Sequence, residues 1–207
     1  MKRKWKLWMI AFVVFVMTDI MMQSNRAEAK KRTFTVSSKT IPCSSSYRQK
    51  PYYNKKTKQY YMINSYMRRL STTGGTLKLK KGTYKIPGTI YVPSNVKIVC
   101  ANGVKIKKTK ATGTKKVKST KFLFQMISEE KASGKQNTGK YAASKNASIQ
   151  GNGKVIFDMG NVNGATAVFV GHASGITVSG VRFRNKKGGS YISVSYTHLT
   201  LPTTPYV

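Results

Sequence analysis

Residues 74–107 constrain the fold of this chain more than any other stretch. They divide at Gly, Pro and Asn residues into five short runs in which apolar residues alternate with polar ones, mostly lysine. Alternation with a period of two over three to five residues predicts half-buried β-strands. The connections span only two to five residues, and their composition favours tight turns. Strands this short that turn this often predict the rungs of a solenoid. The alternating apolar residues are Leu77 and Leu79, Tyr84 and Ile86, Ile90 and Val92, Val96 and Ile98, and Val104 and Ile106.

The first 29 residues have the pattern of an export signal. A basic segment (Lys2, Arg3, Lys4 and Lys6) precedes an apolar run over 7–22, and Ala27-Glu28-Ala29 matches the small-x-small site that signal peptidase cuts after. A membrane anchor is the alternative, but Asp19 within a barely long enough run argues against a stable span. We therefore expect a secreted, extracellular protein, either released or associated with the cell wall.

The charge balance is strongly basic. The chain has 38 Lys+Arg against 5 Asp+Glu, and only Glu129, Glu130 and Asp158 remain acidic after residue 29. An excess this large predicts polyanionic surroundings such as acidic polysaccharide, anionic wall polymer, anionic lipid or nucleic acid. Two interpretations stay open. The lysines form a generally solvated cationic surface, or they line a specific groove for a polyanion. No nucleic-acid-binding module is recognisable.

Two segments precede the first strand. Residues 30–56 are polar and irregular and are expected to form an extended N-terminal arm, laid along the domain or partly disordered. Residues 57–73 repeat apolar residues at helical spacing, with Thr57 as a plausible N-cap and Gly74-Gly75 as the stop. This amphipathic helix is expected to cap the open end of the solenoid. Its tyrosines are expected to pack in the cap rather than to stack on sugars.

The rungs repeat downstream. Residues 94–100, 145–151 and 174–180 align with one another, and each is followed by a second apolar pair. Their phase fits coils of roughly 20–30 residues. Residues 109–144 interrupt the repeat and are predicted to form a loop that projects from the coil, apart from a strand-like stretch at 122–127. In solenoids such insertions tend to lie on the binding face.

A helix that runs into Gly74-Gly75-Thr76-Leu77, followed by the corner Lys81-Gly82-Thr83-Tyr84 and by Val92-Pro93-Ser94-Asn95-Val96, resembles the N-terminal module of a known superfamily. These are the secreted right-handed parallel β-helix proteins of the pectate-lyase-like type, including those related to glycoside hydrolase family 28. The resemblance covers 57–107 well and extends loosely to about 192. It implies an all-β parallel β-helix over 74–193. It says little about chemistry, because the superfamily includes lyases, hydrolases, tailspikes and non-catalytic surface proteins.

The resemblance implies two reactions on acidic polysaccharides. Lyases hold calcium with several acidic residues, and hydrolases use a pair of carboxyl groups within roughly 5–10 Å. Neither set can be assembled here, since two of the three carboxylates are the adjacent Glu129 and Glu130. The catalytic residues, the metal and any cofactor therefore have no assignment. A weaker candidate site for an anionic sugar consists of Asp158, His172, Arg182 and Arg184. The competing interpretation is that His172 is a corner residue and the other three are ordinary surface charges.

The C-terminal residues depart from the rung pattern. Residues 194–207, VSYTHLTLPTTPYV, resemble translated adapter sequence, so we expect a fragment cut at about 191–193 and assign no role to His198. Cys43 and Cys100 could pair in an exported chain or remain free thiols. The sequence predicts the N-terminal part of a secreted β-helix protein that acts on or binds acidic or cell-wall polysaccharide. The alternatives are a non-catalytic cationic wall-binding β-helix and, less favoured, a tailspike-like fibre.

Overall fold

The computed structural model describes residues 32–133 and 143–195, which form thirteen strands and three helices. The helices are α2 (Ser45–Arg48), α3 (Lys58–Leu70) and α4 (Glu129–Ser133). The strands are β1 (Arg32–Val36), β2 (Gly75–Leu79), β3 (Gly82–Ile86), β4 (Ile90–Tyr91), β5 (Val96–Cys100), β6 (Val104–Lys108), β7 (Phe122–Gln125), β8 (Ser148–Gly151), β9 (Ile156–Asp158), β10 (Thr166–Gly171), β11 (Thr177–Ser179), β12 (Arg182–Arg184) and β13 (Ile192–Ser195).

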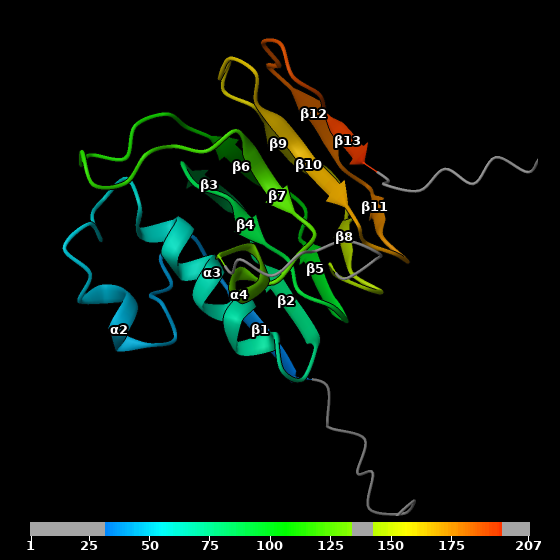
Figure 1. Cartoon of the computed structure of the whole chain (residues 1–207), viewed down its shortest axis with the longest axis horizontal. Coiled ribbons are helices and arrows are strands. Elements are labelled where there is room, and N and C mark those ends of the chain that lie inside the picture. Colours follow the sequence, from blue (N-terminus) through cyan, green and yellow to red (C-terminus); the bar gives the residue numbers. More distant parts are fainter. Residues whose placement is uncertain (1–31, 134–142, 196–207) are drawn as a thin grey trace, which may run out of the picture. The chain divides into compact units, whose positions relative to one another are not determined.

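The strands form three sheets, and every pair of neighbouring strands is parallel. Sheet A has the order β1-β2-β5-β8-β11, sheet B the order β12-β9-β6-β3, and sheet C the order β13-β10-β7-β4. From β2 onward the chain visits A, B and C in turn, so β2–β4, β5–β7, β8–β10 and β11–β13 are four successive coils (Figure 1). This mostly-β architecture of parallel sheets is consistent with the predicted solenoid.

Alternation along each strand separates an inner from an outer face. In β2, Leu77 and Leu79 are buried while Lys78 is exposed, and β3 and β5 repeat the pattern. The parallel register stacks the inner residues into columns, such as Leu77 on Ile98 and Ile98 on Ile149. Burying each such side chain contributes about 1.5–3 kcal/mol. The stacked columns therefore form the continuous core that the alternating runs predicted.

One inner column narrows from coil to coil. Leu79 stacks on Cys100 and Cys100 on Gly151. A β-carbon built on Gly151 would lie 2.1 Å from the carbonyl oxygen of Gly180, so this position has no room for any side chain. The column therefore tapers from leucine through cysteine to glycine.

The corners that lead into sheet A use residues with positive φ. Asn95 has φ 60°, Asn146 has φ 52° and Gly175 has φ 62°, a region that asparagine and glycine occupy more readily than other residues. These corners stack on one another through the backbone, because the N–H of Asn95 donates to the carbonyl of Lys145 at 2.8 Å and that of Asn146 to Ser174 at 3.0 Å. Corner chemistry therefore maintains the register that the core columns require.

Helix α3 is the helix expected over 57–73, and it packs against β2, β3 and β4. Met62, Ile63, Met67 and Leu70 belong to the same buried core as the inner strand residues. Tyr61 is buried and lies in ring contact with four other tyrosines, which gives the cap a second, aromatic cluster. Those rings belong to Tyr47, Tyr52, Tyr53 and Tyr60.

The N-terminal arm is more ordered than its composition predicted. Residues 32–36 form β1, which extends sheet A by pairing with β2, with Phe34 opposite Leu77. Residues 45–48 form the short helix α2. The RTFTV segment alternates polar and apolar residues like the later strands, but the surrounding polar residues concealed this signal.

The strand-like stretch predicted at 122–127 is confirmed, and it divides the loop that was predicted over 109–144. Residues 122–125 form β7, a full member of sheet C between β4 and β10. Leu123 and Phe124 are fully buried, so the coil continues through the middle of the expected insertion. The described loop is thus shorter, covering 109–121, and α4 follows β7.

Other predictions concern the two ends of the chain and its cysteines. Residues 1–29, expected to be the signal, lie outside the described part. Val194 and Ser195 pair with Val170 and Gly171 as part of β13, so the rung pattern continues two residues beyond the predicted boundary. Both cysteines are free thiols. No helix within the described residues is long and apolar enough to span a membrane.

Candidate functional site

The outer face of sheet B gathers basic side chains from neighbouring strands. Lys85 of β3 pairs in register with Lys107 of β6, which is followed across the sheet by Asp158 of β9 and Arg184 of β12. We call these four residues the first row. Neighbouring strands in a sheet lie about 4.8 Å apart, so the row places charged groups at a regular spacing.

A second row runs beside the first. Register aligns Thr83 with Lys105, Lys105 with Ile156 and Ile156 with Arg182. Across both rows the face carries five cationic side chains and one carboxylate. Lys85, Arg182 and Arg184 are exposed, and Lys105 and Lys107 are partly exposed. We refer to the two rows together as the cationic face.

Asp158 does not act as a free anion on this face. Its side chain is 2% exposed, and one carboxylate oxygen lies 2.8 Å from the Nζ of Lys105. The other oxygen accepts hydrogen bonds from the side-chain amide of Asn185 at 2.8 Å and from the backbone N–H of Gly160 at 2.9 Å. Burial opposes ionisation, but these donors outweigh it and lower the pKa of Asp158 below its usual range. Asp158 therefore links three successive coils.

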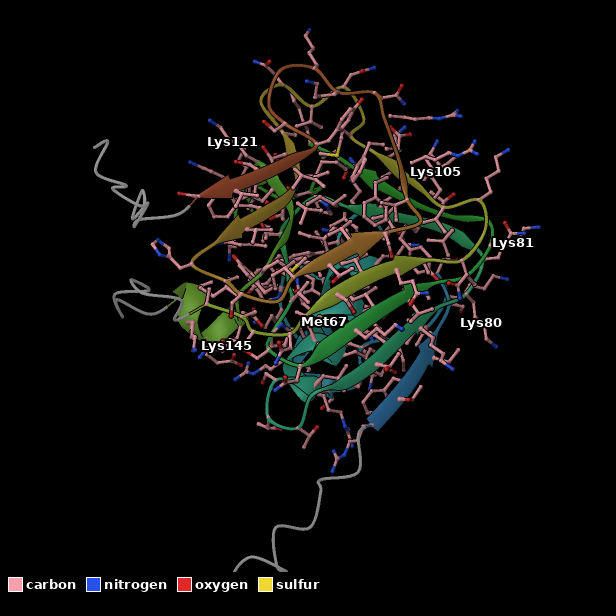
Figure 2. All side chains as sticks on the ribbon, turned by 90° about the vertical axis from the view of Figure 1, so that its right-hand side faces the viewer. Met67, Lys80, Lys81, Lys105, Lys121 and Lys145 are labelled. Carbon is pink, nitrogen blue, oxygen red and sulfur yellow. The ribbon has the colours of Figure 1, made fainter. Side chains whose placement is uncertain are left out.

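Lysines also line one edge of this face. Figure 2 shows Lys80, Lys81 and Lys105 along the same side of the molecule, with Lys121 and Lys145 on the opposite side. The aliphatic stem of Lys81 lies over the corner at Gly103, where a built β-carbon would be 2.9 Å from its Cγ. Lysines therefore lie on both sides of the molecule in this view, and strand register aligns those of the cationic face in rows.

Three of the four residues singled out from the sequence lie on sheet B. Arg182 and Arg184 point outward from β12 as alternation predicted, and Arg184 pairs in register with Asp158. His172 lies apart from them, at the corner that follows β10 in sheet C, with φ 53°. Its backbone carbonyl accepts a hydrogen bond from the N–H of Ala143 at 3.1 Å.

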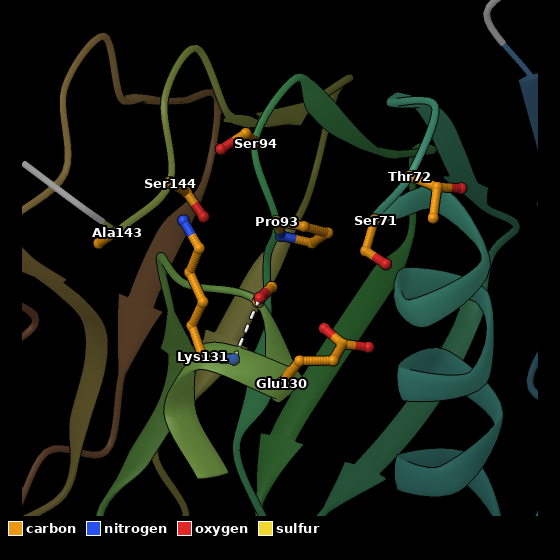
Figure 3. Close-up of a pocket in the computed structure, with 9 residues that line it drawn as sticks. Ser71, Thr72, Pro93, Ser94, Glu130, Lys131, Ala143 and Ser144 are labelled. Atoms are coloured by element: carbon orange, nitrogen blue, oxygen red, sulfur yellow. Dashed lines mark hydrogen bonds between the residues drawn. The ribbon is translucent and has the colours of Figure 1, made fainter. Parts of the chain in front are cut away.

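A separate hollow of about 370 Å³ lies near the end of α3. Glu130 and Lys131 line it together with several hydroxyl groups, and Figure 3 shows Lys131 extending toward Ser144 while Glu130 lies nearer Ser71. Because its two charges have opposite signs, this hollow has little preference for anions. The remaining lining residues are Thr72, Pro93, Ser94, Ser128 and Ala143.

The described carboxylates all have cationic or hydroxyl partners. Glu129 accepts a hydrogen bond from the Tyr47 hydroxyl at 3.2 Å, and Glu130 lies 3.5 Å from the Nε of Arg68. Within residues 32–133 and 143–195, no group of three His, Cys, Asp or Glu side chains could hold a metal ion. The described residues therefore offer neither a calcium cage nor an unengaged carboxylate pair.

Sequence reasoning missed the most unusual charged residue, Lys108. It is fully buried at the end of β6, where its Nζ donates to the carbonyl oxygens of Gly88 and Phe122 at 2.8 Å and of Pro87 at 3.0 Å. Thr120 Oγ1 is a fourth oxygen, at 3.2 Å. Burial lowers the pKa of Lys108 to about 7. Lys108 continues the alternation of the inward residues Val104 and Ile106, so the strand pattern by itself predicts that its side chain points inward.

Comparisons of the chain with protein-family models, with curated proteins and with solved structures gave no match. The candidate site therefore rests on the residues and geometry described above.

Proposed function

We propose that this protein is a secreted, right-handed parallel β-helix that binds acidic polysaccharide or another anionic wall polymer along the cationic face. The observation that carries the proposal is the register of sheet B, which aligns Lys85, Lys107 and Arg184 in one row and Lys105 and Arg182 in the other. A linear polyanion that crosses the strands meets a cationic group on three of the four coils. The export pattern of residues 1–29 supports secretion.

We propose binding rather than catalysis because of the state of the acidic side chains. Asp158 is neutralised by Lys105 and is nearly inaccessible, and the other two carboxylates lie on α4 with partners of their own. Glycoside hydrolysis needs one carboxyl group to donate a proton and a second to act as base or nucleophile. The cationic face supplies neither group, whereas it does supply the positive charge that holds a polyanion.

A charge-matched pair of variants tests this proposal. Lys85→Gln, Lys107→Gln and Arg184→Gln together remove the three cations of the first row. Lys78→Gln, Lys97→Gln and Lys145→Gln remove the same charge from exposed positions elsewhere. Binding to polygalacturonate is measured by isothermal titration calorimetry at fixed ionic strength. We expect the first triple variant to bind about tenfold more weakly, or worse, and the second to lose less than about threefold, since each tenfold change corresponds to about 1.4 kcal/mol.

Two results would contradict the proposal. Equal losses in both triple variants would show that overall charge, rather than the cationic face, binds the polymer. Binding of fully methyl-esterified polygalacturonate as tight as that of the acidic form would show that charge is not what is recognised. Repeating the titration at several salt concentrations gives an independent measure of the charged contacts. A variant that makes fewer of them releases fewer counterions on binding, so its affinity falls less steeply as the salt concentration rises.

A further inference from the structure

A second hollow, of about 340 Å³, lies between α2 and α3 and has a different lining from the one near Glu130 and Lys131. Two arginines and four residues with hydroxyl groups line it, together with Cys43. We call it the arginine pocket. Its polar lining residues are Ser44, Ser46, Tyr47, Ser65, Arg68 and Arg69.

The lining of the arginine pocket is rich in hydrogen-bond donors and contains no carboxylate. A guanidinium has five N–H donors and no acceptor. The Nε of Arg68 lies 3.5 Å from Glu130, and the Arg68 side chain also interacts with the Tyr47 hydroxyl. One carboxylate oxygen and one hydroxyl cannot accept all five N–H groups. Arg68 therefore keeps N–H donors available for a ligand even while it is paired.

Arg69 contributes a second cation whose position is set by packing. Its guanidinium carbon lies 5.6 Å from the centre of the Phe34 ring, an arrangement that arginine favours because its planar group stacks on aromatic faces. Phe34 belongs to β1, so the strand missed at the sequence level positions this side chain. A hollow lined by two arginines and by serines supplies the N–H and O–H donors that suit the planar or tetrahedral oxygens of a carboxylate or a phosphate.

The volume of the hollow indicates the size of the molecule that would carry the anionic group. About 340 Å³ falls at the lower end of the range for small-molecule sites and exceeds what a lone inorganic anion fills. We propose that the arginine pocket binds an oxyanion-bearing sugar unit, either a uronate or a sugar phosphate. This proposal does not depend on the cationic face, because the pocket lies on the N-terminal helices and its ligand is one unit rather than a polymer.

Arginine side-chain NMR of the full chain tests the proposal site by site. The Nε–Hε resonances of Arg68 and Arg69 are assigned from Arg68→Gln and Arg69→Gln and followed during titration with glucuronate, glucose 6-phosphate and neutral glucose. We expect at least one of the two anions to shift both resonances to saturation, and glucose to leave them unchanged. Which anion binds more tightly distinguishes a uronate from a phosphate ligand.

Matched variants complete the test. Arg69→Gln is expected to weaken anion binding about tenfold or more, and Arg182→Gln, on the cationic face, to leave it unchanged. If Arg69→Gln does not fold, Arg69→Lys, which keeps the positive charge, and Ser46→Ala, which removes one hydroxyl group, are each expected to weaken binding severalfold. The proposal is wrong if neither anion shifts Arg68 and Arg69, if glucose shifts them equally, or if Arg182→Gln causes the same loss. Polygalacturonate binding, tested separately, can fail or succeed independently of these results.

Discussion

The first and the last of the described coils carry similar apolar residues at equivalent register positions but differ sharply in burial. In the first coil, Leu77, Tyr84 and Ile90 are fully buried. Their counterparts in the fourth coil are less protected, with Val178 and Phe183 only partly buried and Ile192 46% exposed. The first coil is covered by α3, β1 and the second coil together. In a stacked architecture, the contribution of an apolar residue therefore depends on the layers on both sides of it.

Phe157 and Phe183 provide the sharpest test of this comparison. Both are phenylalanines in adjacent coils, they pair in register, and the centroids of their rings lie 5.8 Å apart. Phe157 is fully buried and Phe183 is not. We expect Phe157→Ala to lower the free energy of unfolding by about 3–5 kcal/mol and Phe183→Ala to lower it by less than half as much. Urea denaturation measures both. Equal losses of stability in the two variants would show that the contribution of a phenylalanine does not depend on the coil in which it lies.

Lys108 tests whether the early coils tolerate a buried charge. Its folded pKa of about 7 lies below its ordinary value of 10.5, so between those pH values the unfolded chain holds a proton that the folded chain has released. Stability relative to Lys108→Met should therefore rise with pH from about 7 to 10.5 and level off above it, by up to a few kcal/mol. Denaturation of both proteins across this pH range gives the difference.

The opposite pH result would also be informative. The four oxygens around Nζ favour the ammonium form. A stability difference that stays constant from pH 7 to pH 10 would mean that this cage holds the proton against the effect of burial.

Asp158 tests how the fourth coil is held in place. Its carboxylate joins Lys105 of the second coil to Asn185, which follows β12 of the fourth. We expect Asp158→Asn to cost about 1–2 kcal/mol near neutral pH. Because the folded pKa is lowered, the contribution is present above the unfolded pKa of about 3.8 and disappears as the pH falls through the folded pKa. A loss that persists unchanged in strong acid would contradict this account.

Ile192 should give the smallest effect. At 46% exposed it has little buried area to lose, so Ile192→Ala is expected to change the free energy of unfolding by less than about 1 kcal/mol. Ile90→Ala, at the other end of the same inner column of sheet C, is the control and is expected to cost about 2–5 kcal/mol. Thermal unfolding of the pair is sufficient to rank them.

The sequence predicted the regular part of the fold because that part depends on local alternation. The strands between Leu77 and Ile106 bury every second residue and are separated by turns with glycine, proline and asparagine, so strands and corners were both visible. The errors occurred where long-range pairing decides the structure. β1 was missed because only its pairing with β2 makes it a strand, and the strand-like stretch at 122–127 was predicted without its place in sheet C between β4 and β10.

The candidate site was predictable only in part for the same reason. Alternation placed Arg182 and Arg184 outward, but their alignment with Lys105 and Lys107 needs the register across a long interruption. The ion pair that occupies Asp158 depends on the same register. The arginine pocket could not be foreseen, because Ser44 and Ser46 approach Arg68 and Arg69 only through the packing of α2 beside α3.

The taper from Leu79 through Cys100 to Gly151 has a consequence for folding fidelity. Coils of similar shape can in principle stack one step out of place, which is a characteristic failure of repetitive proteins. Such a slip would put a leucine or cysteine side chain where the carbonyl oxygen of Gly180 leaves no room even for a β-carbon. The narrowing column thus distinguishes the first two coils from the third and fourth, which carry Gly151 and Gly180, and steric overlap excludes arrangements that exchange them.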